Sequence, residues 1–180
     1  MIIQEDNMDN PVLKAIADRR SIRSYKAEKV TREQIDIILK AGQEAPSARN
    51  SQPWHFTVVQ DEAILKMIYE ETKKAAKEEL ADIYHGAKTV IFISCDPAAR
   101  WARLDSGIAV QNMALAAHAI GLGTVILGRP DAAFTGSRGA ELNKLLKFPE
   151  GHAFAVSIAV GIPAGTKDAH PMEPGRIAYI

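Results

Sequence analysis

Two polar segments of this 180-residue chain carry side chains whose types and spacing suit the binding of a ligand. The first segment places three arginines and one serine within five positions: Arg19, Arg20, Ser21 and Arg23. Guanidinium groups keep their charge and offer several N–H donors, so the cluster suits a phosphate group. The alternative role is structural, because arginines at the end of a helix cap its last carbonyls and complement its dipole. Spacing alone favours that structural role, since runs of charge are usually solvated.

The second segment is a proline-containing run, 45–54, with the sequence APSARNSQPW. Its short hydrogen-bonding side chains are Ser47, Asn50, Ser51 and Gln52. On a rigid loop such groups suit the recognition of a heterocycle that has donors and acceptors along its edge. A plain connection between a helix and a strand is the alternative, and the segment by itself favours it. Trp54 and Phe56 are expected in the core, because aromatic residues at the start of a strand usually pack inward.

Other chemistries find weak support in the sequence. The glycine-rich run 121–128 follows a helix and enters a strand, which reverses the order found in a dinucleotide-binding loop. Its last residue, Gly128, is expected to mark a close approach between the backbone and a ligand. The five histidines lack the paired spacing of metal ligands, so no metal site is expected. Cys95 ends an apolar run and is interpreted as a buried structural thiol, and no nucleophile–base pair is recognisable.

Regular elements must hold the two polar segments in place, and the chain carries clear signals for them. Helix N-caps are expected at Asn10, Thr31, Asp61 and Asp105. The second of these helices has a full signature, in which Thr31 and Gln34 form a capping box and Val30 packs on Ile35. The later helices are expected over 62–80, 105–120 and 138–147. Strands are expected over 54–59, 89–95, 124–127 and 154–160.

The order of these elements and the composition bound the class of protein. Helices that alternate with about four strands indicate an α/β or α+β layered domain, with strand order and direction left open. With 22 basic and 22 acidic residues, the chain has no net field that would recruit nucleic acid or an anionic membrane. Its apolar runs are too short to span a bilayer, and residues 1–10 lack the features of a secretory signal. One cysteine suits a reducing compartment. We therefore expect a single cytoplasmic domain over residues 1–180.

The order of the polar segments resembles the nitroreductase family. The motif RRSIRSY at 19–25 precedes a capped helix, and APSARNSQPWHF follows that helix at 45–56. A third motif, DSGIAVQNMALA at 105–116 followed by GLG at 121–123, is similar to the central helix of the same family. The similarity covers residues 10–162. It implies an α+β fold with a mostly antiparallel central sheet flanked by helices, an intertwined homodimer, and FMN bound at the subunit interface.

The resemblance also assigns roles to individual residues. The FMN phosphate and ribityl chain, or the polar edge of the ring, would be held by Arg19, Arg20, Ser21 and Arg23. The loop of the partner subunit would reach the flavin with Pro46, Ser47, Ala48, Asn50 and the nearby Gln52. Leu127 and Gly128 would supply backbone groups near the reactive edge of the ring, and Arg176 matches a phosphate-binding arginine of the family. No catalytic side chain is expected, because the flavin carries the chemistry and the protein binds and orients it.

The implied activity is the transfer of electrons from NADH or NADPH, through bound FMN, to a nitroaromatic, quinone or similar small acceptor by a ping-pong mechanism. Only the short run 96–104 joins the strand at 89–95 to the next helix, where longer family members have a helical excursion over the pocket. The pocket is therefore expected to be open, or roofed by Arg100, Trp101 and Arg103. Alternatives are a specialised flavin reductase (dehalogenase, pteridine or enone reductase), a flavin-binding module without turnover, and a phosphate-binding domain without flavin.

Overall fold

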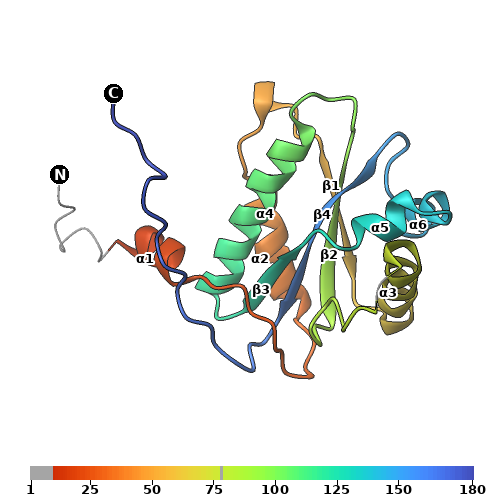
Figure 1. The fold of residues 1–180 in the computed structure, drawn as a ribbon, viewed down its shortest axis with the longest axis horizontal. Coiled ribbons are helices and arrows are strands. Elements are labelled where there is room, and N and C mark those ends of the chain that lie inside the picture. Colours follow the sequence, from red (N-terminus) through yellow and green to blue (C-terminus); the bar gives the residue numbers. More distant parts are fainter. Residues whose placement is uncertain (1–9, 78) are drawn as a thin grey trace.

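One four-stranded antiparallel sheet forms the centre of the molecule in the computed structural model, which describes residues 10–77 and 79–180 (Figure 1). The strands are β1 (Trp54–Val59), β2 (Thr89–Cys95), β3 (Gly123–Leu127) and β4 (Ala153–Gly161), in the spatial order β1-β2-β4-β3. Every neighbouring pair is antiparallel, which confirms the α+β sheet that the family resemblance implies. Each strand lies within one residue of its expected range. The N-terminal stretch 1–10, expected to be no secretory signal, lies outside the described residues except for Asn10.

Helices cover both faces of this sheet, so the molecule has three layers (Figure 1). On one face lie α2 (Arg32–Gln43) and α4 (Ala102–Ala119), and on the other lie α3 (Glu62–Ala76), α5 (Asp131–Thr135) and α6 (Gly139–Leu145). Strand β2, which lies inside the sheet, shows why helices pack on both faces: all seven of its residues are buried. Its Val90 and Phe92 pack with α3, whereas its Ile91 and Ile93 pack with α2 and α4. Side chains alternate between the faces of a strand, so a continuous apolar run indicates burial on both faces.

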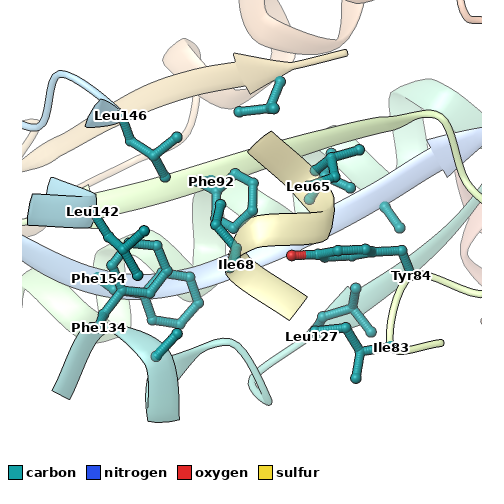
Figure 2. Close-up of a cluster of buried hydrophobic side chains, with 14 of the residues drawn as sticks. Leu65, Ile68, Ile83, Tyr84, Phe92, Leu127, Phe134, Leu142, Leu146 and Phe154 are labelled. Atoms are coloured by element: carbon teal, nitrogen blue, oxygen red, sulfur yellow. The ribbon is translucent and has the colours of Figure 1, made fainter. Parts of the chain in front are cut away.

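Aromatic rings fill the core beneath α3, α5 and α6 (Figure 2). Phe92 of β2, Phe134 of α5 and Phe154 of β4 meet there, and the Phe134 and Phe154 rings are stacked with centroids 4.8 Å apart. Helix α5 has no counterpart among the sequence expectations, because five residues are too few to show a helical period. Gly139 begins α6 so close to α5 that a Cβ atom there would overlap the Phe134 carbonyl oxygen.

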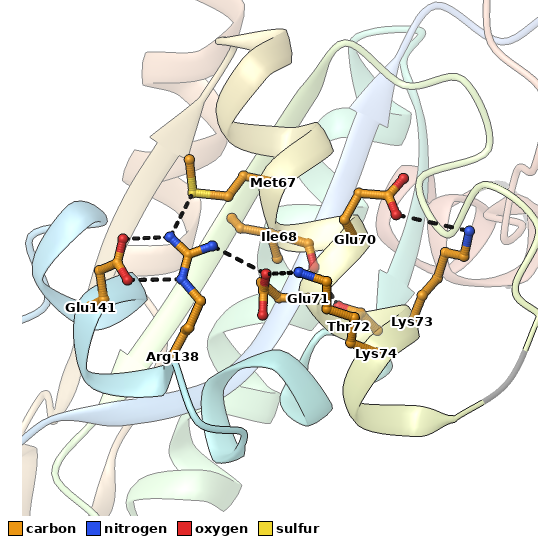
Figure 3. A network of polar contacts seen from close by, with 9 residues as sticks. All are labelled: Met67, Ile68, Glu70, Glu71, Thr72, Lys73, Lys74, Arg138 and Glu141. Atoms are coloured by element: carbon orange, nitrogen blue, oxygen red, sulfur yellow. Dashed lines mark hydrogen bonds and ion pairs between the residues drawn. The ribbon is translucent and has the colours of Figure 1, made fainter.

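A charged network ties α3 to α6 at the edge of this core (Figure 3). Glu71 of α3 is only 8% exposed and accepts hydrogen bonds from Lys74 Nζ at 2.7 Å and from Arg138 Nη1 at 3.1 Å. Arg138 also pairs with Glu141 in the first turn of α6. The hydrogen bond from Lys74, assisted by Arg138, lowers the pKa of the Glu71 carboxyl, so this nearly buried group stays ionised. The network lies on the face of the sheet opposite α4, and its role is structural.

Three of the expected helix caps are confirmed. Asn10 Oδ1 accepts a hydrogen bond from Val12 N at 2.9 Å at the start of α1 (Pro11–Asp18). Thr31 and Gln34 form both bonds of the capping box of α2, with Gln34 Oε1 accepting from Thr31 N at 3.0 Å. Asp61 caps α3 by accepting from two backbone N–H groups of its first turn. Each cap satisfies N–H groups that have no partner within the helix.

The fourth expected cap is wrong, and so are two helix ends. Helix α4 begins at Ala102, so Asp105 lies inside its first turn and is not the cap. Helix α3 ends at Ala76 rather than at residue 80, because Lys77 adopts a left-handed conformation with a φ of 53°. Helix α6 is shorter than the expected 138–147. Among the helices in the described ranges, none is long and apolar enough to cross a membrane.

Helix α1 and the C-terminal tail lie outside the layered core. All eight residues of α1 are exposed or half-buried, and its expected apolar face is uncovered in the single chain: Val12, Leu13 and Ile16 are 62%, 44% and 52% exposed. The segment after α1 joins the edge of the sheet, where Ile22 N donates to Thr124 O of β3 at 2.9 Å. The tail that follows β4 is extended and passes α1 (Figure 1).

Candidate functional site

The arginine segment, 19–23, lies where α1 ends and the chain reaches β3. Arg19 is the C-cap of α1, and Ser21 forms a parallel bridge with Thr124. Arg20 Nη1 donates to Ala17 O at 2.6 Å and to Arg19 O at 2.9 Å, so this guanidinium does cap the helix as the structural interpretation expects. Arg23 Nη1 donates a longer bond of 3.4 Å to Ser21 O. The segment is therefore held by local backbone contacts at the edge of the sheet.

Two adjoining hollows, of about 430 and 460 Å³, open beside this segment. Arg19, Arg20 and Lys167 line both of them. Within the described part of the chain, Arg19 Nε is buried and has no hydrogen-bond partner. A buried donor without an acceptor is costly, and an anion in the hollow would supply the acceptor. The charge and the donors at this position therefore fit a phosphate group.

Lys167 was not expected at this site from the sequence. It lies in the tail after β4, far along the chain from Arg19 and Arg20, and no local motif surrounds it. Only the return of the tail past α1 brings the three cations to the same hollows. Arg176, which the family resemblance matches to a phosphate-binding arginine, is exposed and lies beyond Met172, the last residue that lines either hollow.

The second polar segment forms a strained loop between α2 and β1. Ala48–Asn50 is a single 3₁₀ turn, and three residues have positive φ values: Arg49 at 56°, Asn50 at 55° and Gln52 at 44°. Residues with a Cβ atom rarely adopt this conformation, and such strain concentrates at ligand-binding sites. Inside the loop, Gln52 N donates to Ser47 Oγ at 3.0 Å and Gln52 Nε2 donates to Asn50 Oδ1 at 3.1 Å. The sequence-predicted loop residues Pro46, Ser47, Ala48, Asn50 and Gln52 thus form one compact unit.

Asp105 anchors this loop to α4. The residue is 3% exposed, and Ala48 N donates to Asp105 Oδ1 at 3.2 Å and to Oδ2 at 3.3 Å. The contact joins residues 57 positions apart, so local sequence reasoning assigned Asp105 to a helix cap instead. The signal that could have found it is an acidic residue in the first turn of a helix whose N-cap position is held by Trp101, a residue whose side chain cannot accept a hydrogen bond.

The two polar segments lie at opposite ends of α4 within one chain (Figure 1). The loop contacts the first turn of α4 through Asp105, whereas the arginine segment and His118, near the last turn, line the same hollow. Helix α4 has 18 residues, and at 1.5 Å per residue it is about 27 Å long. The two contact positions, Asp105 and His118, are 13 residues or about 20 Å apart along it, so each segment lies near its own end of the helix.

Leu127 and Gly128 lie at the far end of β3. Leu127 O accepts a hydrogen bond from Ser157 Oγ at 3.1 Å, and Gly128 O accepts one from Asp131 N at 3.0 Å. Space around Gly128 is open, since an added Cβ would meet no atom within 4 Å. The close approach of a ligand to Gly128 stays a prediction.

Trp54 and Phe56 are only partly in the core. Their rings are stacked with centroids 6.2 Å apart, they pack against the core shared by α2 and α4, and both also line an open hollow beside Gln52. Burial, with a smaller contribution from the charge of His152, lowers the pKa of neighbouring His55. The rings therefore form a half-exposed surface that continues the 45–54 loop.

Cys95 and the side chains of the types that bind metals show no second site within the described residues. Cys95 is buried, and burial raises the pKa of its thiol, which disfavours the reactive thiolate. Across residues 10–77 and 79–180, no three His, Cys, Asp or Glu side chains gather in an arrangement that would hold a metal ion.

The short connection before α4 places an arginine and a tryptophan side by side at the N-terminal end of that helix, which the 45–54 loop also contacts. Trp101 is 48% exposed, and the Arg100 guanidinium lies over its ring at 4.7 Å from the centroid. A cation above an indole face is a favourable arrangement and orients both groups. These residues belong to the turn that leads into α4, whose first turn carries Asp105.

Comparisons with known proteins agree with this geometry. The model of the nitroreductase family matches residues 16–162. A nitroreductase with bound FMN from Desulfitobacterium hafniense has a TM-score of 0.89 to this chain at 32% identity, covering 96% of this chain and 100% of that one. An FMN reductase [NAD(P)H] of Bacillus subtilis is 33% identical over 92% of this chain and 71% of its own length. An iodotyrosine deiodinase of Thermotoga neapolitana is 28% identical over 89% and 93%. The chain belongs to the nitroreductase family.

Proposed function

We propose that this protein is an FMN-dependent oxidoreductase that takes electrons from NADH or NADPH. The observation that carries the proposal is the buried, unpartnered Nε of Arg19, a residue that lines two hollows together with further cations. The phosphate of FMN would supply the missing acceptor and balance the local charge of Arg19, Arg20 and Lys167. The relatives with bound FMN and with an NAD(P)H-dependent name support the choice of cofactor and electron donor.

Each group of site residues has its own task in this proposal. Bound FMN would supply the redox chemistry, which needs no acid–base pair from the protein. The phosphate and ribityl end would be bound by Arg19, Arg20, Ser21 and Arg23. The ring would be oriented by Pro46, Ser47, Ala48, Asn50 and Gln52 of the loop. Leu127 and Gly128 would supply backbone groups near the ring, and Arg176 would approach the phosphate from the tail.

The active form in this proposal is a homodimer with FMN at the subunit interface. Two observations support it: the two binding segments contact α4 at positions about 20 Å apart along the helix, and α1 presents an uncovered apolar face. A second copy of the chain would bring its own loop to the arginine segment and cover Val12, Leu13 and Ile16. Apolar side chains gathered on one exposed helix face are typical of an interface.

The electron acceptor is proposed to be a nitroaromatic, a quinone or a similar small molecule, reduced in a ping-pong cycle after the oxidised nicotinamide leaves. The loop end of α4 would receive it, beside Trp101 and Arg100, which offer an aromatic face and positive charge. Arg103 follows in the first turn of α4. This open arrangement suits flat, electron-poor or anionic acceptors.

Purified protein tests the proposal directly. We expect a flavin absorption spectrum that NADH or NADPH bleaches and that an acceptor restores, at rates that show parallel double-reciprocal lines for a ping-pong cycle. The acceptor panel should contain nitroaromatics, quinones, a pteridine, an enone and a halogenated phenol, so that a specialised reductase is detected. Protein that binds no added FMN would refute the proposal, and protein that binds FMN but reacts with neither nicotinamide would be a binding module.

A further inference from the structure

We infer that Asp105 is the positioning residue that holds the 45–54 loop in its ligand-binding shape, and that it thereby sets the affinity for FMN. The inference rests on the proposed function, because it assigns a role within the same site. It concerns a residue that touches no cofactor itself and acts through the Ala48 N–H group.

The contact of Asp105 with the loop is a charged hydrogen bond in a buried position. Both carboxylate oxygens lie within 3.3 Å of Ala48 N, and Asp105 is 3% exposed. Burial of a carboxylate is unfavourable unless donors approach it, and bonds to a charged acceptor are stronger than neutral ones. The pairing therefore fixes the position of Ala48 relative to α4.

The shape of the loop gives this anchor its importance. Arg49, Asn50 and Gln52 hold positive φ values that residues with a Cβ atom leave readily when contacts are lost. Other hydrogen bonds of residues 47–52, such as Gln52 N to Ser47 Oγ, join loop residues to one another. Asp105 instead joins the loop to α4, a long helix of the core, so it fixes the orientation of the strained loop relative to that helix.

A second polar contact on the same face of α4 supports this interpretation. Asn112 follows Asp105 by seven residues, or two helical turns, and its Nδ2 donates to Ala41 O near the end of α2 at 3.2 Å. Beside the second contact, Gly42 lies so close to Met113 that an added Cβ would be 2.9 Å from Met113 Cγ. Helix α4 therefore fixes both the end of α2 and the middle of the loop that follows.

An alternative role for Asp105 is the stabilisation of α4 itself, because an acidic residue near a helix N-terminus interacts favourably with the helix dipole. The two roles predict different behaviour of variants. A dipole role requires the negative charge, whereas an anchoring role requires an acceptor for Ala48 N–H, which the amide oxygen of asparagine also provides.

The test compares Asp105→Ala, Asp105→Asn and a matched control, Thr57→Val. Thr57 also bridges a side chain to a distant backbone carbonyl, since its Oγ1 donates to Leu146 O at 2.8 Å, but it lies on β1 away from the loop. Three quantities are measured on each full-length protein: the dissociation constant of FMN by quenching of flavin fluorescence, the unfolding of the apoprotein in urea, and the rate of tryptic cleavage after Arg49, which is exposed in the loop.

We expect Asp105→Ala to weaken FMN binding by about tenfold or more and to accelerate cleavage after Arg49, because a charged hydrogen bond is lost. Asp105→Asn should stay within about threefold of the wild type in both measurements, a difference well below that of a lost charged bond. Thr57→Val should lower stability and leave FMN affinity and cleavage unchanged. Wild-type FMN affinity in Asp105→Ala, or equal loss in the Ala and Asn variants, would overturn the inference.

A further variant covers the case in which Asp105→Ala does not fold. Ala48→Pro deletes the donor and keeps the carboxylate, and Ser47 already has the extended conformation (φ −140°, ψ 154°) that a residue before proline prefers. It should also weaken FMN binding and accelerate cleavage after Arg49, and unchanged binding there would refute the anchor. Failure of the wild type to bind FMN would instead refute the proposed function, so the two failures are distinguishable.

Discussion

At the scale of single residues, the most informative side chain is that of Arg19, because one of its hydrogen-bond donors has no acceptor in the described part of the chain. Arg20 beside it uses its guanidinium to cap α1, whereas Arg19 Nε is buried without an acceptor. The four polar residues of this segment are therefore unequal. The structural interpretation holds for Arg20, which caps α1, whereas phosphate binding stays a proposal that Arg19 fits best.

Removal of the Arg19 guanidinium should weaken the binding of FMN through its phosphate. A charged hydrogen bond is worth about 1.5–3 kcal/mol, so we expect Arg19→Ala to raise the dissociation constant of FMN by roughly 10- to 150-fold. Riboflavin, which lacks the phosphate, should bind the variant and the wild type equally. Both constants follow from flavin fluorescence titration.

A suitable control is Arg32→Ala, since Arg32 is an exposed arginine in α2 that pairs with Asp36. This variant should bind FMN as the wild type does. If riboflavin loses as much affinity as FMN in Arg19→Ala, the assignment of Arg19 to the phosphate is wrong.

At the scale of elements, the layer made by α3, α5 and α6 contains two short helices that depend on close packing rather than on strong helix signals in the sequence. Helix α5 is five residues long, and α6 follows it after a tight turn. Gly139 permits that turn, because any side chain there would collide with the backbone of Phe134. The aromatic stack of Phe134 on Phe154 then holds α5 against the sheet.

Substitution of Gly139 by alanine should destabilise this layer. Overpacking typically costs 1–3 kcal/mol, and the rigid carbonyl places Gly139→Ala at the upper end, roughly 3 kcal/mol. For a chain of this size the melting temperature should fall by roughly 6–12 °C. Differential scanning calorimetry of the apoprotein measures the change.

The matched control is Gly107→Ala in α4, where an added Cβ meets no atom within 4 Å. Alanine there should raise stability by roughly 0.5–1 kcal/mol, because glycine is a poor helix former. A melting temperature of Gly139→Ala equal to the wild-type value would show that the α5–α6 turn relaxes without cost.

At the scale of the whole molecule, the single chain contains both parts of the candidate site but separates them. Helix α4 sets that separation, and α1 and the tail extend from the core with their apolar side chains uncovered. The proposed dimer would satisfy both features at once. Flavin binding and self-association should therefore be lost together.

A charge on the exposed face of α1 tests this coupling. Val12 is 62% exposed in the single chain, so Val12→Asp should leave the fold intact while it blocks a second copy from covering α1. We expect the variant to be monomeric in sedimentation experiments and to lose at least roughly tenfold in FMN affinity, since one of the two binding segments is then missing.

Leu145→Asp on α6 is the control, because Leu145 is also an exposed apolar residue, 39% exposed, but lies in the layer on the other face of the sheet. It should remain dimeric and bind FMN normally. A monomeric Val12→Asp protein that binds FMN as tightly as the wild type would contradict the shared site.

The sequence alone determined the elements of the sheet, most helix starts and the family. These features rest on local signals. N-caps at Asn10, Thr31 and Asp61 act within one helical turn. The continuous apolar sequence of β2 indicates by itself that the strand is buried. The two polar segments were also recognised, because each is continuous in the sequence. Their joint use in one site stays a proposal.

Only the tertiary structure decided which residues surround those segments. Asp105 bonds to the loop and Lys167 lines a hollow beside the arginine segment, each across a long stretch of chain, so no local pattern shows which residues they meet. The same holds for the uncovered α1 and for the distance along α4, which depend on how the helices pack. Hydrogen bonds of caps form between neighbours in sequence, whereas the anchoring and spacing of a binding site depend on contacts that exist only after the layers have assembled.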